Sequence, residues 1–105
     1  MRQTKQIRRI MQMEENLDAA KEVLERFQRA LDDYTAIQGT ILELEEYYGS
    51  DWRKDFEADE AGKLPQDLKR GVLSEDALYD VLAENRLAAS DALYSLAQMI
   101  GQGVI

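Results

Sequence analysis

Apolar residues recur along the first half of the chain at alternating steps of three and four. Charged side chains fill most of the intervening positions, and no Gly or Pro interrupts residues 2–38. This N-terminal stripe consists of Ile10, Met13, Leu17, Ala20, Leu24, Phe27, Leu31 and Tyr34. The spacing places every member on one face of an α-helix and is typical of a coiled-coil seam. It predicts a long helix over residues 4–36 whose apolar face needs a partner.

The pattern changes near the end of this helix. The next two steps, from Leu31 to Tyr34 and then to Ile37, are both three, and Gly39 follows directly. We therefore expect a break or a sharp kink within residues 37–40 and a second helix over residues 39–48. A shift of this kind also occurs inside continuous coiled coils, so an uninterrupted helix is the alternative.

Gly residues divide the middle of the chain into short elements. Gly49 is expected to end the second helix in the left-handed conformation. Ser50 can then cap a short helix over residues 51–61, with Asp51 in its first turn. Gly62 is expected to close that helix.

Pro65 marks a turn, because its ring disfavours helical geometry at the preceding residue. Pro65 can itself open a helical turn over residues 65–70, which Gly71 would stop.

The last helix has the clearest start in the sequence. Ser74 stands at the N-cap of a helix over residues 75–100, and Leu73 and Leu78 occupy the two positions of a hydrophobic staple. A tail over residues 101–105 is expected to fray. No stretch alternates between apolar and polar residues as a strand would. The sequence thus predicts a single all-α domain, residues 1–105, with the long N-terminal helix antiparallel to the C-terminal helix and short helices between them.

Composition narrows the classes of function. The net charge of −8 argues against binding to nucleic acid or to anionic membranes, which needs Lys and Arg. The chain has no Cys and no His, so it lacks a disulfide framework, a thiolate nucleophile and the commonest metal ligand. No apolar run is long enough for a membrane span or a signal core, and we expect a cytoplasmic protein.

The densest acidic cluster, residues 55–60, does not match a known cation loop. If Asp55 starts an EF-hand loop, Glu60 stands where Gly is required and Gln66 where the bidentate Glu is required. On a helix, Asp55 and Asp59 would share a face, but a solvated acidic surface accounts for them better. We therefore predict no metal site, no cofactor and no catalytic residue.

Aromatic residues concentrate around the first short helix, and a basic pair follows it. Aromatic and Arg side chains are frequent anchors of protein interfaces, although the same residues also serve as the lid of a small core. The candidate interaction surface consists of Tyr47, Tyr48, Trp52, Phe56, Lys69 and Arg70.

The middle of the chain resembles a small bacterial family of unknown function, domain-of-unknown-function family 4298. The resemblance covers residues 7–86 and is most specific over residues 47–86. It is carried by Tyr47-Tyr48-Gly49-Ser50, Trp52, Asp55-Phe56-Glu57, Asp59-Glu60, Gly62-Lys63-Leu64-Pro65, Leu68 to Asp76, Tyr79, Leu82 and Glu84-Asn85-Arg86. It implies a bacterial cytoplasmic protein and adds no activity, cofactor or site.

The N-terminal stripe favours a non-enzymatic protein–protein interaction module that self-associates, most simply as a coiled-coil-like dimer. The first alternative is a small helical enzyme or ligand-binding protein with a pocket near Tyr48, Trp52, Arg70 and Glu84. The second alternative is a regulatory partner that presents the acidic residues 55–60 to a basic protein.

Overall fold

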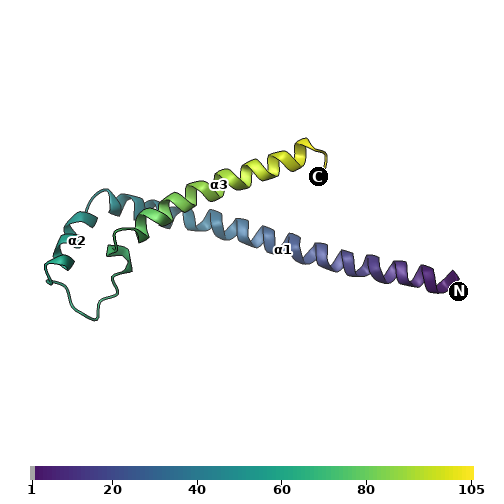
Figure 1. Ribbon diagram of the computed structural model, residues 1–105, viewed down its shortest axis with the longest axis horizontal. Coiled ribbons are helices and arrows are strands. Elements are labelled where there is room, and N and C mark those ends of the chain that lie inside the picture. Colours follow the sequence, from purple (N-terminus) through teal and green to yellow (C-terminus); the bar gives the residue numbers. More distant parts are fainter. Residues whose placement is uncertain (1) are drawn as a thin grey trace. The chain divides into compact units, whose positions relative to one another are not determined.

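The computed structural model describes residues 2–105, with side chains from Thr4 onward. Helix α1 (Arg2–Tyr48), helix α2 (Trp52–Glu60), the short 3₁₀ helix η1 (Gly71–Leu73) and helix α3 (Ala77–Gly101) follow one another along the chain (Figure 1). No strand occurs within the described residues, and the prediction of an all-α fold is confirmed.

Helix α1 runs without interruption through Gly39, so the expected break at 37–40 is wrong, as are separate helices over 4–36 and 39–48. A single Gly costs a helix only about 1 kcal/mol, which good helix-forming residues on both sides can offset. The seam also keeps its period, because Gln38 fills the position four after Tyr34 and Ile41 follows three later. The Gln38 side-chain amide donates to the Tyr34 carbonyl at 2.9 Å within the same turn.

The chain divides into two compact units, one ending at Gly39 and the other comprising Thr40–Ile105. The first unit is the N-terminal part of α1, and its large apolar side chains are about half exposed; Leu17 is 48% and Leu24 is 67% exposed. Surface ion pairs join Glu22 to Arg26 and Glu25 to Arg29, each one helical turn apart. Because all four side chains are well exposed, these pairs add little stability.

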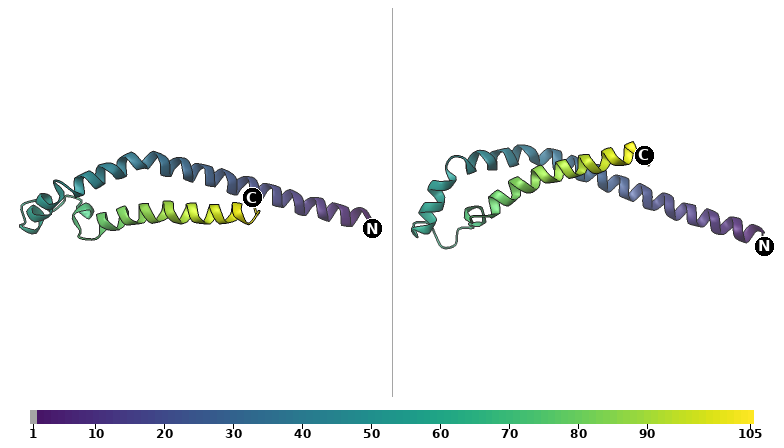
Figure 2. Two further views of the ribbon diagram at one scale, coloured as in Figure 1. Left: turned by 90° about the horizontal axis from the view of Figure 1, so that it is seen from above. Right: turned by 45° about the horizontal axis from the view of Figure 1, so that its top comes forward.

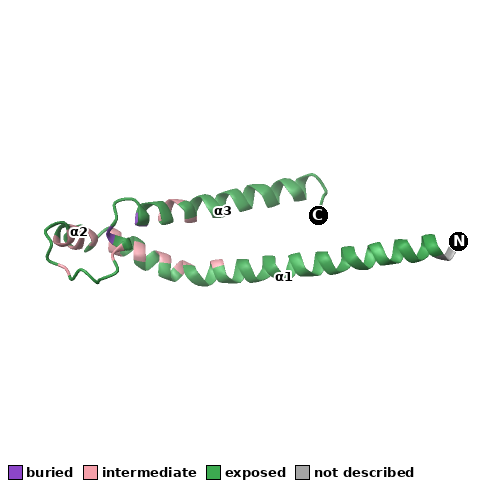
Figure 3. Cartoon of the chain, turned by 60° about the horizontal axis from the view of Figure 1, so that its bottom comes forward, coloured by how far each residue is buried: buried purple, intermediate pink, exposed green. Residues whose placement is uncertain are grey.

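The second unit contains the buried core. Leu73 and Leu78 are its buried apolar residues, at 7% and 3% exposure. The short helix η1 contacts both α2 and α3, and partly buried residues gather around it and at the end of α1 (Figure 3). The Ser74 hydroxyl accepts the Ala77 amide hydrogen at 3.3 Å. The predicted N-cap at Ser74 is wrong, because α3 begins at Ala77 rather than at residue 75 and Asp76 takes its N-cap position without a side-chain bond. The two leucines predicted as the staple are nevertheless the buried residues of this unit.

Two glycines that follow helices behave differently. Gly62 has φ +70°, and the next amide, of Lys63, donates to the Ala58 carbonyl at 3.0 Å. This is the left-handed closure predicted for α2. Gly49 is not left-handed, so the prediction for it is wrong; its amide donates to the Glu45 carbonyl at 3.1 Å in ordinary helical geometry. The chain enters α2 without a reversal of handedness.

The expected Ser50 cap is also absent. The Ser50 hydroxyl donates to the Glu46 carbonyl at 2.7 Å, which ties it to the end of α1, and Asp51 takes the N-cap position of α2 without a side-chain bond. The predicted helical turn over 65–70 is reduced to one bond, from the Leu68 amide to the Pro65 carbonyl at 3.3 Å. Helical geometry resumes at Gly71, which opens η1 where it was expected to end a turn.

The C-terminal segment is tied to α3. Gly103 has φ +73°, and the Val104 amide donates to the Met99 carbonyl at 3.0 Å. These are the bonds of a Schellman closure. The tail expected to fray over residues 101–105 is therefore held as far as Val104. A single domain over residues 1–105 stays a prediction.

Candidate functional site

A hydrogen bond between two candidate residues fixes the bend from α1 into α2. The Tyr47 hydroxyl donates to Asp55 Oδ2 at 2.6 Å. Burial, this hydrogen bond and the negative charges of Asp55 and Asp51 together raise the pKa of the Tyr47 hydroxyl to about 12. Tyr47 is therefore neutral at physiological pH and serves as a donor, which excludes it as a general base there.

Three aromatic rings continue across the same bend. Tyr48 meets Trp52 edge-on, with ring centroids 5.2 Å apart, and Trp52 stacks on Phe56 at 5.0 Å. The Trp52 indole Nε1–H donates to the Val72 carbonyl at 2.8 Å. Aromatic pairs of this kind contribute about 0.5–1.5 kcal/mol each beyond their burial. The stack thus links the end of α1 and α2 to η1.

Arg70 closes the segment between α2 and η1. Its guanidinium donates to Asp59 Oδ1 at 2.6 Å, to the Leu68 carbonyl at 3.2 Å and to the Pro65 carbonyl. The side chains of Arg70 and Asp59 are only 37% and 19% exposed, so solvent screens this ion pair less than the pairs on α1. The neighbouring Lys69 is exposed. Arg70 therefore ties the segment between α2 and η1 to α2.

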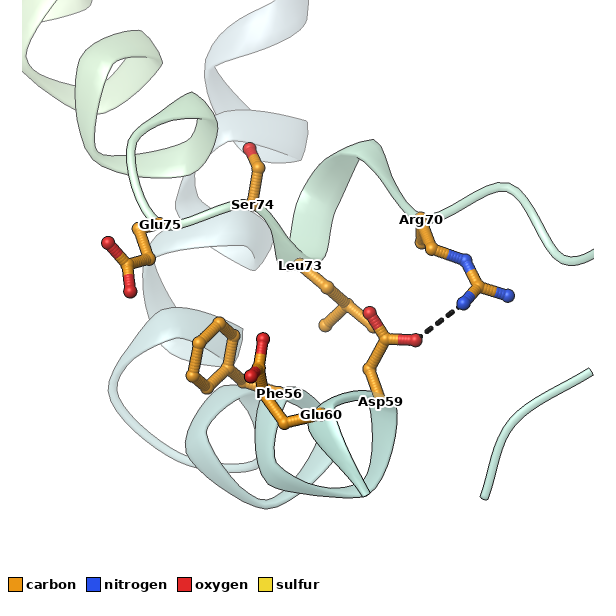
Figure 4. A pocket seen from close by; sticks show the side chains of 7 residues that line it. All are labelled: Phe56, Asp59, Glu60, Arg70, Leu73, Ser74 and Glu75. Atoms are coloured by element: carbon orange, nitrogen blue, oxygen red, sulfur yellow. Dashed lines mark hydrogen bonds and ion pairs between the residues drawn. The ribbon is translucent and has the colours of Figure 1, made fainter. Parts of the chain in front are cut away.

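A hollow of about 350 Å³ lies beside the Arg70–Asp59 ion pair, as Figure 4 shows. Phe56 and Leu73 supply apolar surface, and Asp59, Arg70, Glu60, Ser74 and Glu75 supply polar groups. Its one hydroxyl nucleophile, Ser74, donates to the Gly71 carbonyl at 3.0 Å and has no base as its acceptor. The residues that line the hollow therefore form no nucleophile–base pair of the kind that acyl transfer requires.

A second, smaller hollow of about 210 Å³ lies where the last turns of α1 contact the first turns of α3. Tyr48, Tyr79 and Leu82 line it, and Arg86 bonds Glu45 across it at 3.1 Å. Figure 2 shows these two helix ends from two further directions.

The pocket considered from sequence does not assemble around these hollows. Tyr48 lines the smaller hollow and Arg70 the larger one, while Trp52 and Glu84 line neither. Glu84 is exposed on α3. Tyr48 and Trp52 are in contact, but Arg70 and Glu84 line neither hollow together with them.

The two acidic residues considered for a cation have separate partners. Asp55 accepts the Tyr47 hydroxyl, and Asp59 accepts the Arg70 guanidinium. Among the side chains that the structure describes, no group of three or more acidic residues is placed to hold a metal ion. Likewise, none of the helices within residues 2–105 combines the length and apolar character needed to cross a membrane.

Five of the six residues of the candidate interaction surface make internal contacts, and their role toward a partner stays a prediction. The sequence did not indicate the partners of Trp52 and Arg70, which are the Val72 carbonyl and Asp59, nor the separate Glu45–Arg86 pair. These partners lie 11 to 41 positions apart in the chain. No local spacing rule reaches across such distances.

The N-terminal stripe is an exposed apolar face of the first unit. Its large aliphatic and aromatic members from Ile10 to Leu31 are 45–67% exposed, and the flanking Ile7 and Val23 are each 53% exposed. Figure 3 shows this part of α1 as exposed throughout. Exposed apolar surface of this extent marks an association site more often than it occurs on a free monomer.

Comparison with known families finds one match, to a family described as a domain of unknown function (DUF4298), over residues 10–95. Comparison with curated proteins and with solved structures finds no match.

Proposed function

The chain belongs to the DUF4298 family, whose description states no activity, and we propose from its geometry that it is a non-enzymatic interaction module that self-associates through the N-terminal stripe. The observation that carries the proposal is the exposure of this stripe along the first unit. A cytoplasmic location is part of the proposal.

The stability of an isolated helix supports this proposal. An amphipathic helix owes most of its stability to packing of its apolar face, because nucleation is costly and each residue adds little. The first unit is a single helix, and it has no core of its own. A regular face of Leu, Ile, Met and Phe on such a helix is stabilised by a second helix laid against it.

Helix lengths show that the chain cannot supply the whole of that second helix. At ~1.5 Å per residue, the 47 residues of α1 extend about 70 Å, whereas the 25 residues of α3 extend about 37 Å. Whatever its placement, α3 covers at most about half of α1. The rest of the apolar face needs another molecule.

Light scattering coupled to size exclusion tests the proposal. We expect the wild-type chain at high micromolar concentration to have a mass above the 12.0 kDa of the monomer. Leu24→Glu removes one Leu per copy from the stripe, which costs a dimer about 3–6 kcal/mol. Its dissociation constant should rise at least about 100-fold.

Met11→Glu is the matched control. Met11 is 60% exposed on the same helix but lies outside the stripe, so the same change of charge there should leave the mass unchanged. Far-UV circular dichroism shows whether both variants remain helical. A wild-type chain that is a clean monomer at high micromolar concentration contradicts the proposal, as does equal weakening by the two substitutions.

A further inference from the structure

We propose that two copies pair through the N-terminal stripe in antiparallel orientation, with the twofold axis beside Glu22. This inference rests on the proposed function, and it specifies the partner as a second copy and fixes its direction. In this register each stripe residue faces a different stripe residue of the second copy. The four layers are Ile10 with Tyr34, Met13 with Leu31, Leu17 with Phe27 and Ala20 with Leu24.

Side-chain size favours this register. Ala20, the smallest member of the stripe, faces Leu24, and Phe27 faces the smaller Leu17. In a parallel pair Ala20 would face Ala20 and leave a void, while Phe27 would crowd against Phe27. Interiors pack at nearly constant density, and both voids and crowding are destabilising. The antiparallel layers are more even in volume.

The order of charges along α1 favours the same direction. Four exposed blocks alternate in the sign of their net charge along the helix: +3 over residues 5–9, −3 over 14–18, +1 over 21–29 and −2 over 32–33. The third block is nearly neutral, because Glu22 and Glu25 pair with Arg26 and Arg29 within it. Reversal of the helix about Glu22 brings each block near one of opposite net charge in the second copy, although Lys21 and Glu22, beside the axis, lie near their own counterparts. Complementary charges of this kind fix the direction of helix pairing.

A parallel pair would place each block beside its own copy. The parallel pair would gain one favourable ion pair, because Arg9 could then reach Glu14 of the second copy. Against this stand the repulsion between like blocks and the uneven layers. Like charges held side by side cost stability where opposite charges would add it.

Disulfide trapping distinguishes the two directions, and the chain has no native Cys to interfere. Met13→Cys and Leu31→Cys stand in one antiparallel layer, where Cβ atoms approach closely enough for a bond. In an antiparallel pair formed by two copies of the same single variant, the two thiols would lie about 27 Å apart along the helix axis. In a glutathione redox buffer we expect the two single variants to crosslink when mixed, and neither to crosslink alone.

The results distinguish an antiparallel pair, a parallel pair and a monomer. Crosslinking of the mixture alone, read by non-reducing electrophoresis and mass spectrometry, supports the antiparallel register. Crosslinking of Leu31→Cys with itself overturns it in favour of a parallel pair, while the proposed function stands. A monomeric wild-type chain overturns both.

A second measurement leaves the stripe intact. Nitroxide labels on Glu22→Cys or Arg8→Cys lie outside the seam, and pulsed electron resonance reports the distance between copies. The antiparallel register expects a short distance at Glu22 and one longer by about 40 Å along the axis at Arg8. Equal, short distances at both positions would overturn it.

Discussion

Gly39 provides a test of the continuous helix, because it lies in the interior of α1 with open space around it. Beyond the neighbouring backbone of its own helix, a Cβ at this position would meet no atom within 4 Å, so Gly39→Ala neither fills a gap nor creates a clash. The expected gain comes from the backbone alone, since Gly loses more conformational freedom on entering a helix than Ala does. The gain should be about 1 kcal/mol, or roughly 4–8 °C in melting temperature for a chain of this size.

The measurement is thermal and urea unfolding followed by circular dichroism at 222 nm. Wild type and variant are compared at one protein concentration, because self-association adds to apparent stability by mass action. Gly62→Ala is the matched control: a Cβ there also meets nothing, but φ is +70°. It should lose about 1–2 kcal/mol, which is the cost of the left-handed region for a residue with a Cβ.

The same Gly→Ala substitution is thus expected to stabilise the chain at residue 39 and to destabilise it at residue 62. If residues 37–40 formed a break in which Gly39 adopted a non-helical conformation, Gly39→Ala would be neutral or destabilising, like the control. That result would refute the continuous helix and restore the two separate helices that the sequence suggested.

Two further predictions concern the contacts around α2. The pKa of Tyr47, raised to about 12, means that this group's contribution to folding is complete below pH 10 and is lost between pH 10 and 12. Absorbance at 295 nm should show a tyrosine ionising near pH 12, and Tyr47→Phe should remove that phase; loss of a phase near pH 10 instead would contradict the bond to Asp55. Arg70→Lys should speed proteolytic cleavage between α2 and η1, because Lys cannot bridge Asp59 and two carbonyls at once, whereas the exposed Lys69→Ala should not.

The comparison of Gly49 and Gly62 shows how far sequence reasoning reaches. Both come after a helical pattern, and both fit the rule that Gly closes a helix. Only Gly62 needs the left-handed conformation, because the chain turns away from α2 there, whereas after Gly49 it passes into α2 through a bend held by Tyr47 and Asp55. Which Gly closes a helix depends on the direction that the chain takes next in space, and local sequence does not contain that information.

Signals within about one helical turn gave mixed results, because those at Gly49 and Ser50 were wrong whereas those around Ser74 located the core. The staple residues Leu73 and Leu78 were identified from their positions around Ser74, and they form the buried core of the second unit. The bonds from Trp52 to Val72 and from Arg70 to Asp59 depend on how the chain folds back, and no spacing predicts them. Candidate residues were therefore found in the middle of the chain, but their internal partners were not.

These internal partners weaken the aromatic and basic residues around α2 as a candidate surface for association. A side chain that already makes an internal hydrogen bond contributes less binding free energy to an interface, because that bond must be kept or replaced when the interface forms. Trp52 and Arg70 are committed in this way, since their polar groups hold η1 and the segment before it. The apolar side chains of the N-terminal stripe from Ile10 to Leu31 carry no N–H, O–H or carbonyl group, and burying them gains free energy directly. Of the two surfaces considered from sequence, the N-terminal stripe is therefore the better candidate for association.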